Sequence, residues 1–156
     1  MSTVTLSEIG LLCRRLKRQG KKIVLTGGCF DVLHPGHVVF LEKAKKQGDV
    51  LLVMLESDAR VKCLKGINRP VHNQKQRAQV LGALKSVDYI LMLPNMKNET
   101  DYDKLTARVK PDVIAATAGD VNNVYRKRAA RLSGAVFKVV TKVVGNHSTS
   151  ALLKRD

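Results

Sequence analysis

With 156 residues, 44% of them apolar, the chain has the size of one domain and enough apolar volume to fill one core but not two. Its 28 lysines and arginines outnumber 13 aspartates and glutamates, and the resulting net charge of +15 favours anionic partners such as nucleotides. An aromatic content of 4% argues against nucleic acid as the main partner, and the lack of a secretory signal or a long apolar stretch predicts a cytoplasmic protein with no membrane partner.

The first expected element is an amphipathic helix over about residues 5–19. Thr5 and Glu8 fit a capping box, and apolar residues then recur at helical spacing, with arginines and lysines on the other side. A β-branched apolar run at 22–26 follows and ends at a pair of glycines, which predicts a strand and a tight turn.

The remaining elements alternate between helix and strand. The run at 50–55 is apolar without alternation, which is typical of a parallel strand covered on both faces. Helices are expected near 38–46, 74–84, 102–109 and 121–132, strands near 89–93, 113–116 and 135–140, and a short closing helix from Ser148. Five strands interleaved with helices predict a single doubly wound α/β domain over 1–156, Rossmann-like, with a five-stranded parallel sheet and a core over about 21–155.

Ligand sites in open parallel sheets lie outside the carboxyl ends of the strands, so the segments after the strands are where we expect chemistry. These segments contain three of the four histidines, several glycines and a lysine and arginine pair, and they are 27–37, 56–70, 117–120 and 145–150. The site is therefore predicted to be assembled from four strand ends.

The segment His34-Pro35-Gly36-His37 places two imidazoles three positions apart near the start of a helix, with a glycine that permits close backbone approach. Unpaired N–H groups and the positive end of the helix dipole attract phosphate there, and imidazole N–H donors beside them can contact an α-phosphate. Fixed donors of this kind stabilise the charge that develops during in-line displacement at phosphorus, so the segment predicts nucleotidyl transfer.

The string Gly-x-Phe-Asp-x-x-His-x-Gly-His at 28–37 resembles the signature of the cytidylyltransferase-like nucleotidyltransferases. Further matches keep the family's order and approximate spacing, namely Leu64-Lys65-Gly66, Arg69-Pro70-Val71, Gln76-Arg77, Gly119-Asp120 and His147-Ser148-Thr149. The similarity covers about 21–155, and within the family it is greatest to the heptose 1-phosphate adenylyltransferase domains.

The resemblance implies an enzyme that joins a nucleoside triphosphate, ATP or CTP, to a phosphorylated acceptor and releases pyrophosphate. It assigns catalysis to His34, His37 and Lys65. It places ten residues at the nucleotide: Gly28, Cys29, Phe30, Gly36, Lys43, Arg69, Gly119, Asp120, Ser148 and Thr149. Asp31, Glu56 and Arg77 are implied to lie at the acceptor. Mg²⁺ is expected, held mainly by the triphosphate with Asp31 as a candidate ligand, and a homodimer is common in such a family.

Some positions depart from the family pattern and leave the acceptor open. Cys29 replaces an aliphatic residue, Glu56 stands where asparagine or threonine is usual, and His147-Ser148-Thr149-Ser150 alters a Ser-Thr-Thr segment. An acidic Glu56 disfavours an anionic group nearby. A sugar phosphate such as heptose 1-phosphate is the leading acceptor, and the alternatives are cytidylyltransferase or FAD synthase activity on glycerol 3-phosphate, a phosphoalcohol or FMN. A non-catalytic nucleotide- or nucleic-acid-binding protein is an alternative of another class, suggested by the charge of +15 and these departures.

Overall fold

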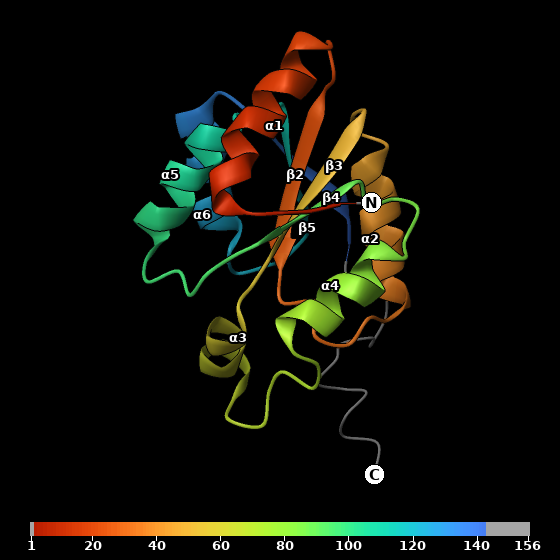
Figure 1. The fold of residues 1–156 in the computed structure, drawn as a ribbon, viewed down its shortest axis with the longest axis vertical. Coiled ribbons are helices and arrows are strands. Elements are labelled where there is room, and N and C mark those ends of the chain that lie inside the picture. Colours follow the sequence, from red (N-terminus) through yellow and green to blue (C-terminus); the bar gives the residue numbers. More distant parts are fainter. Residues whose placement is uncertain (1, 143–156) are drawn as a thin grey trace.

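A parallel sheet of six strands lies at the centre of the computed structural model, which describes residues 2–142 (Figure 1). The strand order is β1-β4-β3-β2-β5-β6, so β2 lies in the middle with β3 on one side and β5 on the other. The strands are β1 (Ser2–Val4), β2 (Ile23–Gly28), β3 (Val50–Leu55), β4 (Tyr89–Met92), β5 (Val113–Thr117) and β6 (Val136–Thr141).

Helices cover both faces of this sheet. They are α1 (Leu6–Arg18), α2 (Pro35–Lys45), α3 (Asp58–Lys65), α4 (Gln74–Gly82), α5 (Glu99–Val109) and α6 (Asn123–Ser133). One apolar cluster joins α1, α5 and α6 to the sheet, and a second joins α2 and α4 to the opposite face. The short helix α3 stands at the lower end of the sheet in Figure 1, beyond the carboxyl end of β3.

The pattern of the central strands explains this double covering. Residues 50–53 of β3 are buried in succession and belong alternately to the two apolar clusters. A strand with apolar side chains on both faces is stabilised only when helices exclude water from both. The doubly wound parallel α/β fold expected from the sequence is therefore confirmed.

The expected count of five strands is wrong, because β1 adds a sixth at the edge beside β4. This strand has only three residues, begins with serine and threonine, and buries only Val4, so it carries no periodic pattern of its own. It forms because its backbone pairs with Tyr89, Ile90 and Leu91 of β4. The closing helix expected from Ser148 lies outside the described residues.

One helix was not expected from the sequence, and another begins earlier than expected. Helix α3 occupies residues 58–65, which were expected only as a segment following a strand, and its Ser57 cap accepts a hydrogen bond from the backbone N–H of Arg60. Helix α2 begins at Pro35 rather than near 38, so the histidine segment belongs to its first turn. Proline is favoured there because its fixed φ suits the first helical position.

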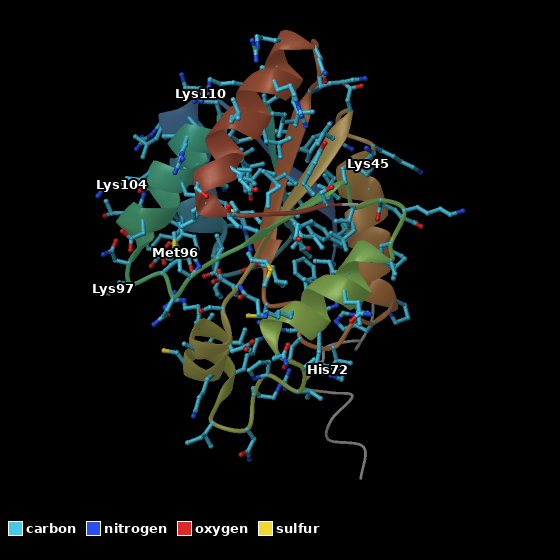
Figure 2. The ribbon with its side chains drawn as sticks, in the orientation of Figure 1. Lys45, His72, Met96, Lys97, Lys104 and Lys110 are labelled. Atoms are coloured by element: carbon cyan, nitrogen blue, oxygen red, sulfur yellow. The ribbon has the colours of Figure 1, made fainter. Side chains whose placement is uncertain are left out.

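Charge is spread over the surface rather than gathered on one element. Figure 2 shows Lys97, Lys104 and Lys110 on the left, at and around α5, and Lys45 on the right, at the end of α2. Among the described helices, none has the length and apolar character needed to cross a bilayer.

Candidate active site

A pocket of about 750 Å³ lies at the carboxyl ends of β2, β3 and β5 and continues along α5 and α6. Its walls include most of the described residues that the sequence places at the site: Gly28, Cys29, Phe30, Asp31, His34, Gly36, His37, Glu56, Lys65, Arg69, Gly119 and Asp120. The loops after three different strands thus meet around one cavity, as a parallel sheet requires at a point where its strand order reverses.

The two motif histidines stack on each other at the start of α2. His34 is the residue that precedes the first turn, with an extended backbone, and His37 lies in that turn. Their ring centroids are 3.8 Å apart with 26° between the ring planes. This position combines the positive dipole end of a helix with two imidazoles, which is a favourable setting for phosphate.

The ring of Phe30 packs against the ring of His37. Their ring centroids lie 5.2 Å apart, and Phe30 is buried with a backbone φ of +42°, a region that bulky residues rarely adopt. A Cβ on Gly28 would lie 3.1 Å from Cε2 of the Phe30 ring. The glycine therefore gives the aromatic ring the space to turn back under the histidine.

The surroundings of His37 keep its imidazole neutral. Burial first, and then the nearby His34 and Lys65, together lower its pKa to about 4, because burial disfavours the charged ring and a second positive charge there is also disfavoured. At neutral pH the ring carries one N–H donor and one acceptor nitrogen. The site can therefore offer His37 to a phosphate oxygen as an uncharged donor.

Asp31 and Arg69 form a buried ion pair at the pocket wall. The carboxylate accepts hydrogen bonds from Nε of Arg69 and, at 2.7 Å, from the backbone N–H of Val71, and its side chain is 1% exposed. Both oxygens of Asp31 are thus engaged in holding the segment that carries Arg69. Asp31 was expected at the acceptor or the metal, and here its direct contacts fix the loop.

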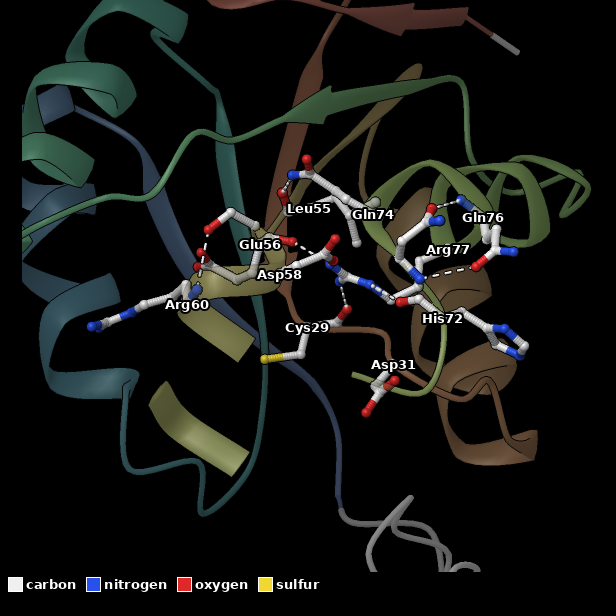
Figure 3. A network of polar contacts seen from close by, with 12 residues as sticks. Cys29, Asp31, Leu55, Glu56, Asp58, Arg60, His72, Gln74, Gln76 and Arg77 are labelled. Carbon is white, nitrogen blue, oxygen red and sulfur yellow. Dashed lines mark hydrogen bonds and ion pairs between the residues drawn. The ribbon is translucent and has the colours of Figure 1, made fainter. Parts of the chain in front are cut away.

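Arg77 is buried, with a side chain that is 0% exposed, and it does not line the pocket. Figure 3 shows its contacts with the neighbouring segments. Its guanidinium donates to the carbonyls of Cys29, His72 (3.1 Å) and Glu56 (2.7 Å), and pairs with Asp58 at 2.8 Å. It thereby ties together the loop after β2, the start of α3 and the segment before α4. The structure places Arg77 in contact with protein groups, whereas the sequence comparison implied the acceptor.

Glu56 follows β3 and projects toward α5. Tyr102, in the first turns of α5, donates its hydroxyl to both carboxylate oxygens at 3.0 Å each. Burial raises the pKa of Glu56, while the hydrogen bond from Tyr102 and the charge of Arg60 oppose that rise. Tyr102 and Arg60 also line the pocket, and sequence reasoning missed both, since neither belongs to a motif.

The loop after β5 is shaped by Gly119 and Asp120. Gly119 has a φ of +74°, which a side chain would disfavour. Burial alone would raise the pKa of Asp120, but hydrogen bonds from the Asn122 backbone and from Arg126, at 2.7 Å, lower it. This carboxylate is consequently ionised and fixed at the rim.

The other predicted residues differ in their placement. Lys65 ends α3 and lines the pocket with an exposed side chain. Burial raises the pKa of Cys29, which keeps it a neutral thiol in the wall. Lys43 is exposed on α2 and does not line the pocket. Ser148 and Thr149 lie outside the described residues.

Within residues 2–142 no three histidine, cysteine or carboxylate side chains are grouped so that they could hold a metal ion. Any divalent ion at this pocket would therefore depend on a ligand for most of its coordination. A triphosphate can supply such oxygens, since Mg²⁺ needs few protein ligands.

Comparison with known proteins agrees with this arrangement. Residues 25–145 match the family described as cytidylyltransferase-like. The bifunctional protein HldE of Aliarcobacter butzleri is 48% identical over 110 residues, covering 70% of this chain and 22% of that protein. The bifunctional protein HldE of Wolinella succinogenes is 41% identical over 149 residues, covering 95% of this chain and 30% of that protein. The chain thus spans less than a third of the length of these relatives.

Two solved structures share the fold. The lipopolysaccharide core biosynthesis protein from Thermoplasma volcanium GSS1 has a TM-score of 0.62 and 28% identity, covering 80% of this chain and 98% of that one. The pantoate-beta-alanine ligase from Francisella tularensis has a TM-score of 0.67 and 18% identity, covering 90% of this chain and 67% of that one. The second likeness concerns the fold alone.

Proposed function

This chain belongs to the cytidylyltransferase-like family of nucleotidyltransferases, and we propose that it transfers AMP from ATP to a sugar phosphate such as heptose 1-phosphate. A phosphate oxygen of the acceptor attacks the α-phosphorus, the bond from that phosphorus to the bridging oxygen breaks, and pyrophosphate leaves. The observation that carries this proposal is the stacked pair His34 and His37 at the first turn of α2, inside the 750 Å³ pocket.

The geometry supports a mechanism based on positioning and charge. The neutral His37 ring supplies a donor, and the N-terminus of α2 supplies the positive end of its dipole, where negative charge grows on the α-phosphate. Lys65, the last residue of α3, lines the pocket and adds a positive charge for the triphosphate. No covalent intermediate is needed, because the acceptor is itself the nucleophile.

Magnesium is part of the proposal. It would be held mainly by the triphosphate, where it would neutralise charge on the phosphates. Asp31 fits poorly as a direct ligand, because Arg69 and the Val71 backbone already occupy its two oxygens.

The choice of ATP and a sugar phosphate rests on resemblance to the heptose 1-phosphate adenylyltransferase domains. The supporting residues are Leu64-Lys65-Gly66, Arg69-Pro70-Val71 and Gln76-Arg77. The matches to the bifunctional HldE proteins and to a lipopolysaccharide core biosynthesis protein agree with this choice. We place the enzyme in the cytoplasm.

Release of pyrophosphate tests the proposal. The protein is incubated with Mg²⁺ and each pair from a panel of ATP and CTP with heptose 1-phosphate, hexose 1-phosphates, glycerol 3-phosphate and FMN. We expect release with ATP and a sugar 1-phosphate, and none when EDTA removes the metal. Release only with CTP, or only with glycerol 3-phosphate or FMN, would replace the proposed substrates, and no release with any pair would overturn nucleotidyl transfer.

A further inference from the structure

One side of the pocket is acidic although the protein carries a net charge of +15. Glu56, Glu99 and Asp103 all line it. Two of these carboxylates have cationic partners, because Glu99 lies 3.8 Å from Arg60 and Asp103 lies 2.7 Å from Arg128. Glu56 differs from them. Among the described residues its hydrogen-bond partner is the neutral hydroxyl of Tyr102, and no cation lies within ion-pair distance of it.

The contact with Tyr102 fixes the orientation of Glu56 and leaves it able to bind more. A single phenol proton is shared between two oxygens at 3.0 Å each. An ionised carboxylate has about four lone-pair sites, so most of them remain for other donors. Since Glu56 and Tyr102 both line the pocket, those sites are within reach of a bound ligand.

The sheet order separates this pair from the other half of the site. β2 carries the histidine segment at its end and lies between β3 and β5. Glu56 follows β3, whereas Gly119 and Asp120 follow β5. A nucleotide on the β5 side therefore leaves the β3 side, with Glu56, for the acceptor.

We propose that Glu56, oriented by Tyr102, accepts hydrogen bonds from acceptor hydroxyls and makes the pocket selective for polyhydroxylated phosphates. This inference rests on the proposed function. The acceptor phosphate lies toward the histidines and Lys65, where positive charge is available, and its hydroxyls lie toward Glu56. A second phosphate at the Glu56 end is repelled. Met54 of β3, which lines the same cavity, is available to contact the carbon skeleton.

Steady-state kinetics with the sugar 1-phosphate that gives the fastest pyrophosphate release test this role. We compare the wild type with Glu56→Gln and Tyr102→Phe. The control is Glu42→Gln, which removes one negative charge from an exposed position of α2 that does not line the pocket. We expect Glu56→Gln to raise the acceptor KM about 10- to 100-fold, as loss of a charged hydrogen bond does, while the KM for ATP stays within about twofold. Tyr102→Phe has a smaller effect in the same direction, and Glu42→Gln has none.

Deoxy analogues of that sugar identify the contact. In the wild type one deoxy analogue loses about 10-fold or more in kcat/KM, and Glu56→Gln abolishes the discrimination. An unchanged acceptor KM in Glu56→Gln, an equal rise in the KM for ATP, or the same discrimination against deoxy analogues in Glu56→Gln and the wild type overturns the inference.

Calorimetric titration separates this inference from the reaction. Hexose 1-phosphates and heptose 1-phosphate are titrated into each protein with a non-hydrolysable ATP analogue present. Binding that weakens about 10-fold in Glu56→Gln supports the role of Glu56 even if no pyrophosphate forms, so only nucleotidyl transfer then fails. Binding that is absent, or equal in both proteins, overturns the role of Glu56.

Discussion

His37 shows how the environment of one residue sets its chemistry. Burial against Phe30, the stacked His34 and the nearby Lys65 all disfavour a charged imidazole. A neutral donor at a helix N-terminus is suited to an α-phosphate whose negative charge increases during reaction. The motif was recognisable in the sequence, but the protonation state depends on burial, which only the packed structure provides.

Turnover tests the donor role of His37. In His37→Ala we expect kcat to decrease about 100-fold or more, because a fixed donor to the developing charge is lost. The KM for ATP should change much less. His72→Ala is the control, since His72 is exposed outside the pocket lining. Equal turnover in His37→Ala and the wild type would exclude the role.

Stability against pH tests the neutral state of His37. The pKa of His37 is about 4 in the folded protein, against 6.5 for the unperturbed imidazole of the unfolded chain. On acidification the unfolded chain therefore binds a proton at His37 before the folded protein does. The free energy of unfolding should be greatest above pH 6.5 and decrease between pH 6.5 and 4, with a contribution from His37 of at most about 3 kcal/mol.

Urea unfolding at pH 7.0, 5.5 and 4.5 measures this contribution. His37→Gln should remove part of the decrease that the wild type shows, whereas His72→Gln should retain all of it. An identical pH dependence in the wild type and His37→Gln would mean that the histidine is not held neutral by the fold.

At the scale of elements, Arg77 connects loops that the sheet alone only brings near one another. Its guanidinium holds carbonyls of the β2 loop and the β3 loop, and it pairs with Asp58 at the start of α3. The helix that ends in Lys65 therefore has a fixed position relative to the histidine segment. The residue was found in the sequence through the family pattern, yet its burial outside the pocket lining could not be read from that pattern.

Arg77→Lys is expected to destabilise the protein by about 3 kcal/mol, because lysine cannot satisfy the three carbonyls and Asp58 at once. Thermal unfolding measures the loss, with the exposed Arg15→Lys of α1 as the control. Because loop positions change, kcat should fall as well in protein that remains folded at the assay temperature. A melting temperature equal to that of Arg15→Lys would contradict the bridging role.

For the molecule as a whole, the net charge of +15 raises the question of whether the protein binds nucleic acid. The lysines of the described residues lie on several helices rather than on one, and the pocket is sized for small molecules. We therefore expect duplex DNA and RNA to bind only in the nonspecific range of about 10⁻⁴ to 10⁻⁶ M at physiological salt. Fluorescence anisotropy over a salt series measures this. Binding much tighter than that range and selective for sequence would favour nucleic acid as the partner.

The homodimer stays a prediction, which sedimentation can test.

The sequence by itself determined the position of the histidine segment at a helix start and the parallel α/β fold, because both follow from local order: short motifs at helix starts and unbroken apolar runs in strands. It could not determine the three-residue β1, whose stability comes from pairing with β4, nor the contact of Glu56 with Tyr102, which joins residues 46 positions apart. Tertiary structure decided these features, because pairing and burial depend on which segments the sheet brings together. It also decided where Arg77 lies, since a buried guanidinium and one lining a pocket have the same sequence pattern.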